Sequence, residues 1–284
     1  MSRICILTPD PAYEENWQPV ADRYAALLGL EVDFRCWHDA GDLGVGDLGG
    51  YALVLPLLAW GYHRAAARWF AALDAWEDAG VRFANPVATL RWNTNKDYLF
   101  DLEAAGVPTV PTRLTHALTR DDIEAARAAF GVETLIIKPS ISGGADATFR
   151  LEPGDAIPFA VLETEMLIQP MMRSIETEGE YSLFYFGGQY SHAILKRPKS
   201  GDFRVQEQFG GGEVVCAPPS AARELADAAL SAAPPGNSYA RVDMLRGDAG
   251  GFVLIELELI EPSLFLEHAS DGGAAFVNAV HAAY

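Results

Sequence analysis

Residues 238–258 read SYARVDMLRGDAGGFVLIELE, a polar turn between two apolar runs. Side chains alternate between the two faces of a β-strand, so Arg241 and Asp243 share one face of the first run, and Glu256 and Glu258 share one face of the second. Buried carboxylates need cations, and a salt bridge to Arg241 accounts for one of the three. Because oxygen ligands suit Mg²⁺, we predict a metal site at these three carboxylates.

Two lysines upstream are candidates for anion binding. Lys96 lies near the start of a predicted helix, and Lys138 ends an apolar strand. A lysine at that point needs an anionic partner or a route to solvent, and taken alone solvent is the simpler explanation. The small residues Ser142, Gly143 and Gly144 follow in a loop whose N–H groups could bind phosphate, although such loops are often hairpin turns. Together these features predict a phosphate site.

A hinge after the next apolar strand contains Gln169, Pro170, Met171 and Met172. Backbone groups of a hinge can bind an adenine edge while Met side chains cover the ring, although Met residues are more often core. Glu180 begins the following strand, where a carboxylate can accept hydrogen bonds from ribose hydroxyls or can simply be solvated. The hinge therefore predicts a purine site.

The chain has 284 residues and is 50% hydrophobic, enough for two or three compact units. We predict an N-terminal parallel α/β unit over 1–90, a small α+β lobe over 91–170 and a sheet-rich lobe over 171–284. Gly187-Gly188 marks a hairpin, and Thr94 is expected to cap a helix. The predicted strands cover 3–7, 51–58, 81–84, 134–138, 147–151, 166–169, 180–186, 189–196, 238–245 and 252–257. The predicted helices cover 20–28, 64–79, 95–105, 122–130, 221–232 and 272–282.

Composition excludes several kinds of partner. A formal charge of −18 disfavours binding to nucleic acid, which needs clustered Lys and Arg. No apolar run approaches the length of a membrane span. The three cysteines are odd in number and far apart, which favours a reducing, cytoplasmic location. The pattern G-x-G-x-x-G over 44–49 precedes an apolar run instead of a helix, so a dinucleotide site there is disfavoured.

The order of these features resembles the ATP-grasp superfamily, and within it the RimK-like and cycloserine-biosynthesis ligase branch. The resemblance covers the whole chain. It rests on RWNTNK at 91–96, GVP at 106–108 and LKRPKSGDFR at 195–204, together with the R-x-D and E-x-E strands. It implies an ATP-grasp fold of the α/β class, with an N-terminal pre-grasp domain and two lobes that clamp ATP.

The resemblance also implies roles for the site residues. Lys96 and Lys138 would contact ATP phosphates, the hinge would contact adenine, and Glu180 would contact ribose. Lys196 and the glycine loop would belong to the nucleotide site, and Asp243, Glu256 and Glu258 would hold Mg²⁺, with Mn²⁺ as an alternative. Arg241 would stabilise an acyl phosphate or tetrahedral intermediate, and Arg204 would face the substrate. Glu258 stands where many relatives carry Asn.

The sequence offers cations and donors but no convincing nucleophile, which suits phosphoryl transfer. Our main hypothesis is an ADP-forming carboxylate–amine or cyclising ligase that acts on a small amino-acid-like substrate through an acyl phosphate. One alternative is a phosphotransferase on the same scaffold. Another is an ATP-binding module without turnover. The resemblance also allows for a homodimer.

Overall fold

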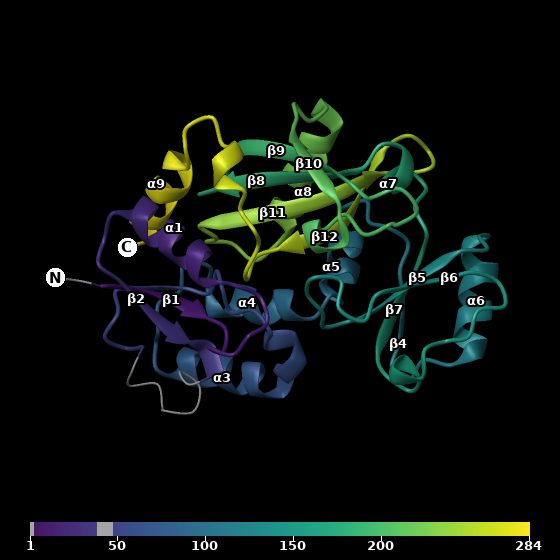
Figure 1. Ribbon diagram of the computed structural model, residues 1–284, viewed down its shortest axis with the longest axis horizontal. Coiled ribbons are helices and arrows are strands. Elements are labelled where there is room, and N and C mark those ends of the chain that lie inside the picture. Colours follow the sequence, from purple (N-terminus) through teal and green to yellow (C-terminus); the bar gives the residue numbers. More distant parts are fainter. Residues whose placement is uncertain (1–2, 39–47) are drawn as a thin grey trace.

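The computed structural model describes residues 3–38 and 48–284 (Figure 1). The glycine pattern over 44–49 lies mostly outside the described residues. Within those residues, no helix is long and apolar enough to cross a membrane. The strands are β1 Ile4–Thr8, β2 Val32–Cys36, β3 Leu53–Leu55, β4 Arg113–Thr115, β5 Leu135–Pro139, β6 Phe149–Leu151, β7 Met166–Pro170, β8 Glu180–Phe186, β9 Gln189–Arg197, β10 Gly212–Val215, β11 Tyr239–Arg246 and β12 Phe252–Glu258.

Helices lie between and around these strands. The α-helices are α1 Gln18–Leu28, α3 Ala66–Asp78, α4 Val87–Thr94, α5 Tyr98–Ala104, α6 Arg120–Phe130, α7 Ser174–Thr177, α8 Ser220–Ala232 and α9 Ala274–Ala283. Short 3-10 helices cover Tyr62–Ala65, Phe159–Val161, Glu207–Phe209 and Leu266–His268. The strands form three sheets, in the orders β2-β1-β3, β10-β9-β8-β11-β12 and β4-β7-β5-β6.

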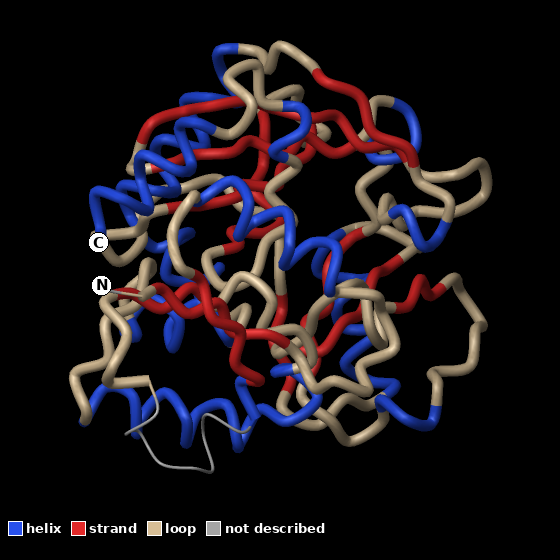
Figure 2. Tube along the Cα trace, turned by 60° about the vertical axis from the view of Figure 1, so that its left-hand side comes forward, coloured by secondary structure: helices blue, strands red, loops and turns tan. Residues whose placement is uncertain are grey.

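The N-terminal sheet is parallel, as predicted, and both faces are covered. Alternate residues of β1 point to opposite sides: Ile4 and Ile6 join a core with α1 and α9, whereas Cys5 and Leu7 join a core with α3. Burial on both faces explains why β1 is apolar from Ile4 to Leu7. Helix α9 lies beside α1 although the two are far apart in sequence, as Figures 1 and 2 show.

One face of the five-stranded sheet is apolar, whereas the other carries both apolar and charged side chains. Strands β8 and β9 form the predicted hairpin around Gly187-Gly188, both at positive φ. On one face, Leu183 and Val242 pack with residues of α8. On the other, Phe184 joins the core around α1 and α9, and Asp243 lies opposite Ser182. Strand alternation therefore points the acidic positions away from α8.

The four-stranded sheet and α6 form a smaller lobe, on the right of Figure 1. Its core includes Leu135 and Ile137 of β5, Ile168 of β7 and Ile123 of α6. A reciprocal pair of hydrogen bonds between Thr119 and Asp122 begins α6 as a capping box. Strand β5 runs from this core toward the rest of the chain and carries Lys138 at its end.

Some predicted elements were wrong in extent. Thr94 does not cap a helix but ends α4: its hydroxyl donates to Leu90 O and accepts from Trp69 Nε1. The predicted helix over 95–105 is shortened to α5, and α4 was missed. The predicted strand over 81–84 is a single bridge at Phe83, and β2, β4 and β10 were missed. Helix α5 packs in the core of the five-stranded sheet, and the boundaries at 90 and 170 stay a prediction.

Candidate functional site

One cavity of about 760 Å³ is lined by residues of the five-stranded sheet, of the small lobe and of the N-terminal unit. Every residue that the sequence analysis selected lines it. These residues are Lys96, Lys138, Ser142, Gly143, Gly144, Gln169, Pro170, Met171, Met172, Glu180, Lys196, Arg204, Arg241, Asp243, Glu256 and Glu258. The structure thus brings together groups that are up to about 160 positions apart in the chain.

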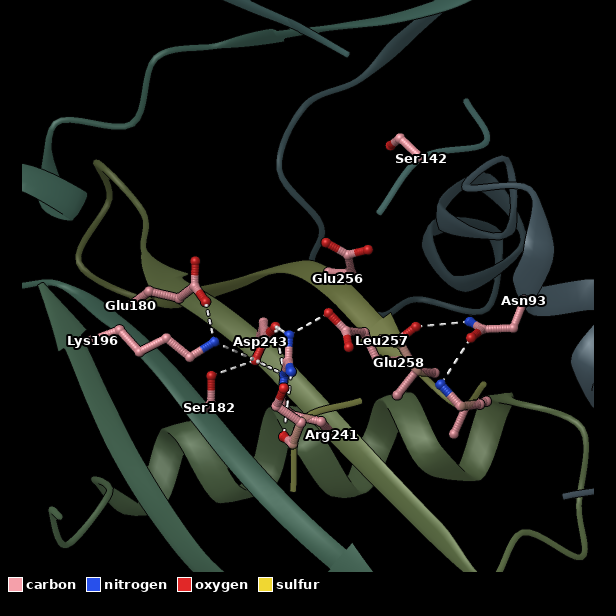
Figure 3. A network of polar contacts seen from close by, with 12 residues as sticks. Asn93, Ser142, Glu180, Ser182, Lys196, Arg241, Asp243, Glu256, Leu257 and Glu258 are labelled. Atoms are coloured by element: carbon pink, nitrogen blue, oxygen red, sulfur yellow. Dashed lines mark hydrogen bonds and ion pairs between the residues drawn. The ribbon is translucent and has the colours of Figure 1, made fainter. Parts of the chain in front are cut away.

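The acidic residues meet because β11 and β12 pair antiparallel, with Asp243 opposite Glu256 and Arg241 opposite Glu258. Arg241 Nε lies 3.0 Å from Asp243 Oδ2, and Nη2 of the same arginine contacts Glu258. Ser182 Oγ donates to Asp243 Oδ1 at 2.5 Å. Figure 3 shows this row of contacts across the strands. Burial alone would raise the pKa of Asp243, but the neighbouring Arg241 lowers it below its usual value.

Salt bridging accounts for more carboxylates than we expected. Arg241 engages two of them, and the third, Glu256, lies 3.0 Å from Lys96 Nζ. The expectation that ion pairing explains one carboxylate was therefore wrong, because Arg241 reaches across the strand pair and Lys96 arrives from outside the sheet. Lys96 Nζ also donates to Ser142 O at 2.5 Å, which ties the glycine loop to the acidic strands.

Lys138 differs from the other lysines of the site. Its ammonium group makes no hydrogen bond or ion pair with any described residue, yet it lines the cavity. Burial lowers the pKa of Lys138, and the nearby Glu256 acts in the opposite direction. A buried ammonium without a bound anion is unfavourable, so this group gains most from an anionic ligand.

The loop after β5 has the backbone of an anion-binding turn. Gly144, Ala145 and Ala147 all have positive φ, near 60°, 60° and 50° in that order. Gly143 has no side chain to fill the space toward His63, where a Cβ would lie 3.1 Å from Nδ1. Successive N–H groups in such turns converge on anions. The loop contacts the opposite lobe through Gln208 Nε2, which donates to Gly144 O at 3.2 Å.

The hinge combines apolar surface with fixed backbone. Met172 belongs to a small buried cluster with Val110 and Leu245, and Met171 N donates to Thr134 O. Gln169 Nε2 donates to Thr112 Oγ1 at 2.9 Å. These contacts leave an apolar wall on one side of the cavity, which fits a planar ring.

Glu180 and Arg204, two further residues predicted for the site, each form an ion pair with a neighbouring side chain. Glu180 Oε1 lies 2.9 Å from Lys196 Nζ in a buried ion pair, and burial raises the pKa of Glu180. Arg204 is held by Asp202 and stacks on Phe209, with 3.7 Å between the guanidinium carbon and the ring centroid. Asp202 and Phe209 together hold the Arg204 guanidinium at the cavity wall.

The sequence analysis missed two residues that support the site: Asn93, which lines the cavity, and the buried Tyr98. Asn93 Nδ2 donates to Leu257 O at 2.7 Å, and Leu259 N donates back to Asn93 Oδ1 at 2.8 Å. The Tyr98 hydroxyl accepts from Leu257 N. Since β12 is the edge of its sheet, these side chains take the place of a further strand and fix the backbone on both sides of Glu258. The only available signal was the position of Asn93, three residues before Lys96 in the RWNTNK motif.

The donor set is compatible with Mg²⁺, although side chains satisfy it here. Within residues 3–38 and 48–284, no group of three or more His, Cys, Asp or Glu is arranged around a metal position. Burial raises the pKa of Glu258 to about 7, with Glu256 and Asp243 adding to the effect against Arg241. That crowding of carboxylates is what a divalent cation would offset, and carboxylate oxygens suit Mg²⁺.

Comparison with known proteins identifies the fold. No protein-family model matches the chain. The cycloserine biosynthesis protein DcsG of Streptomyces lavendulae is 26% identical over 276 residues, 89% of each chain. The crystal structure of D-cycloserine synthetase DcsG superposes with a TM-score of 0.80 and 25% identity over 100% of both chains. The chain has the ATP-grasp fold.

Other ATP-grasp structures agree at the level of fold. D-alanine–D-alanine ligase from Bacillus anthracis gives a TM-score of 0.73 with 16% identity over 100% of this chain and 97% of that one. ATP-grasp ligase PsnB, solved with its minimal precursor, Mg and ADP, gives a TM-score of 0.64 with 16% identity over 99% of this chain and 98% of that one. The predicted resemblance to ATP-grasp ligases is confirmed, and these relatives indicate an ATP-dependent ligase that forms C–N bonds.

Proposed function

We propose that this protein is a Mg-ATP-dependent ligase that joins a carboxylate to an amine, or closes a ring within one molecule, through an acyl phosphate. Its substrate would be small and amino-acid-like. The observation that carries the proposal is the ammonium of Lys138, which has no hydrogen bond or ion pair with a described residue and lies near Glu256 in the cavity that all predicted site residues line. A cavity that combines lysine ammonium groups with carboxylates fits a nucleotide with its metal.

In this mechanism, the chain positions phosphates and neutralises charge. Lys138, Lys96 and the N–H groups of the glycine loop hold the phosphates of ATP, while the hinge holds adenine. A substrate carboxylate oxygen attacks the γ-phosphorus, the bond to the β-phosphate oxygen breaks, and ADP leaves. Mg²⁺, held by Asp243, Glu256 and Glu258, would neutralise phosphate charge.

The second half of the reaction forms the new bond. An amine nitrogen attacks the acyl carbon, the carbon–oxygen bond to phosphate breaks, and inorganic phosphate leaves as the nitrogen loses its proton to water or to a base. Arg241 is fixed by Asp243 and Glu258 and lines the cavity, and its proposed role is to stabilise the tetrahedral oxyanion. Arg204 would contact the substrate.

The test is ADP and phosphate release by the purified chain with Mg-ATP and a panel of small amino acids. We expect release of both products together with an amide. A product that keeps the phosphate would instead identify a phosphotransferase, and binding of ATP without turnover would identify a non-catalytic module. Asp243→Asn and Glu256→Gln should each lower the rate at least about 100-fold, and unchanged turnover in both contradicts the metal assignment.

We also propose a cytoplasmic location, on the count and spacing of the cysteines. We propose a small-molecule substrate because the similar D-cycloserine synthetase and D-alanine–D-alanine ligase act on small molecules. A homodimer stays a prediction.

A further inference from the structure

Glu165 is a carboxylate that the proposed reaction does not use and that is not among the described residues lining the cavity. It directly precedes β7, and its side chain is 35% exposed. Glu165 Oε1 accepts a hydrogen bond from Ser140 Oγ at 2.5 Å and lies 3.5 Å from Asn95 Nδ2. Glu165 Oε2 lies 2.7 Å from His116 Nδ1. The hydrogen bond from Ser140 lowers the pKa of Glu165, so the group is an ionised acceptor near neutral pH.

The partners of Glu165 belong to different parts of the chain. His116 follows β4, which pairs with β7, so His116 and Glu165 both belong to the small lobe. Ser140 is buried, follows β5 and begins the glycine loop. Asn95 ends α4, whose buried residues pack with the N-terminal unit, and precedes α5, which packs with the five-stranded sheet. One carboxylate therefore joins the small lobe and its glycine loop to the rest of the chain.

This junction lies directly behind the groups predicted to bind phosphate. Lys96 follows Asn95, and its backbone N donates to Ser140 O at 2.8 Å. Lys138 lies two residues before Ser140, so the two lysines reach the cavity from the two sides of the junction. A site of this kind is precise only when a second layer of hydrogen bonds holds the groups that contact the ligand. Glu165 supplies such a layer, because it bonds Ser140 and Asn95 together.

The adenine side of the cavity does not depend on the same junction. The hinge lies at the opposite end of β7 from Glu165, and β7 pairs with both β4 and β5 between them. Loss of Glu165 should therefore disturb the phosphate groups and leave the hinge in place.

We propose that Glu165 is a positioning residue for the phosphates of the nucleotide: it holds the start of the glycine loop against the segment that carries Lys96. This inference rests on the proposed function, in which Lys96, Lys138 and the glycine loop bind the phosphates of ATP. Glu165 touches neither nucleotide nor substrate in this role, and acts through Ser140 and Asn95.

The test separates phosphate binding from base binding. Dissociation constants of Mg-ADP and of adenosine are measured on the full chain by displacement of a fluorescent ADP analogue. Glu165→Ala should weaken Mg-ADP binding about fivefold or more, because the phosphate groups lose a hydrogen-bonded support, and should leave adenosine binding within about twofold of the wild type. A general loss of structure would weaken both ligands together.

Glu152→Ala is the matched control. Glu152 is another carboxylate of the small lobe: it accepts from Thr134 Oγ1 at 2.7 Å and lies 2.7 Å from Arg150 Nη2, both within that lobe. Glu152→Ala should lower the urea midpoint about as much as Glu165→Ala and leave Mg-ADP binding unchanged. Glu165→Gln keeps an acceptor oxygen for the Ser140 hydroxyl and should restore most of the affinity.

A double-variant cycle checks that Glu165 acts through Ser140. Ser140→Ala removes the donor of the 2.5 Å hydrogen bond and should itself weaken Mg-ADP binding. The double variant should bind Mg-ADP about as tightly as Glu165→Ala alone, since both changes break one bond. Additive losses contradict this path.

Several outcomes overturn the positioning role. They are equal Mg-ADP affinity in Glu165→Ala and the wild type, an equal loss of adenosine affinity, and an equal loss of Mg-ADP affinity in Glu152→Ala. A wild type that does not bind Mg-ADP overturns it together with the proposed nucleotide site.

The outcomes for the two proposals are separable. Mg-ADP binding that depends on Glu165, without amide formation in any reaction mixture, refutes the ligase and keeps the positioning role. Amide formation by a wild type whose Mg-ADP affinity is unaffected by Glu165→Ala refutes the positioning role and keeps the ligase.

Discussion

Replacing Asn93 by Ala tests whether side chains fix the edge strand that carries the acidic residues. Asn93 is 6% exposed, and its amide satisfies Leu257 O and Leu259 N, whose residues are 1% and 0% exposed. The substitution leaves both backbone groups buried without a partner. Each such group costs about 1–3 kcal/mol, so the free energy of unfolding should fall by about 2–6 kcal/mol. A protein of ordinary stability remains folded after that loss.

The effect on the site separates this idea from simple destabilisation. Glu258 lies between the two clamped residues, so Asn93→Ala should also weaken binding of Mg-ADP, by about tenfold. Asn85→Ala is the matched control: Asn85 is another fully buried asparagine that bonds Tyr239 O and Leu259 O and accepts from Ser238 N. Asn85→Ala should lower the free energy of unfolding at least as much as Asn93→Ala does, and it should weaken Mg-ADP binding less.

Urea denaturation and titration with a fluorescent ADP analogue in Mg²⁺ measure the two quantities. A loss of stability below about 0.5 kcal/mol for Asn93→Ala would refute the clamp. Equal losses of Mg-ADP affinity in both variants would refute its specific role in positioning Glu258.

Three more predictions follow from the site. Lys138→Met should weaken ADP binding about tenfold or more, because it removes a phosphate contact, and it should not lower stability, because the half-buried ammonium has no ion pair with a described residue to lose. Unchanged affinity in the same titration contradicts a phosphate role. The pKa of Glu261 is raised from 4.5 to about 8, so the folded protein binds more protons than the unfolded chain in that window, and its stability falls as pH rises. Urea denaturation of the ligand-free protein should show that the free energy of unfolding falls between about pH 5 and pH 8.5. This fall should be about 1–3 kcal/mol smaller in Glu261→Gln, and equal falls in the two proteins contradict the raised pKa of Glu261. Gly179 has φ +112°, and a Cβ there would lie 2.4 Å from Lys196 O. Gly179→Ala should therefore displace the Lys196–Glu180 ion pair and lower the free energy of unfolding by more than about 2 kcal/mol, which urea denaturation would measure.

Sequence reasoning worked best where the signal was local. The hairpin of β8 and β9 follows from alternating apolar residues around Gly187-Gly188, and the bounds of β8 match the prediction. It failed at α4, where Pro86 begins a helix that ends at Thr94, because Thr94 looked like the cap of the next helix. Strands β4 and β10, with three and four residues, are too short for a period to be recognised, whereas β2, with the sequence VDFRC, alternates apolar and polar residues and was overlooked.

The sequence by itself determined which chemical groups the site contains and which of them share a face. Alternation along a strand puts Arg241 with Asp243 and Glu256 with Glu258, whatever the rest of the chain does. Only the tertiary structure decided what each group meets. The register that sets Asp243 opposite Glu256, the approach of Lys96 to Glu256 and the position of Glu261 beside His63 depend on contacts between segments far apart in sequence. Such contacts are fixed by the packing of whole elements, which no local pattern encodes.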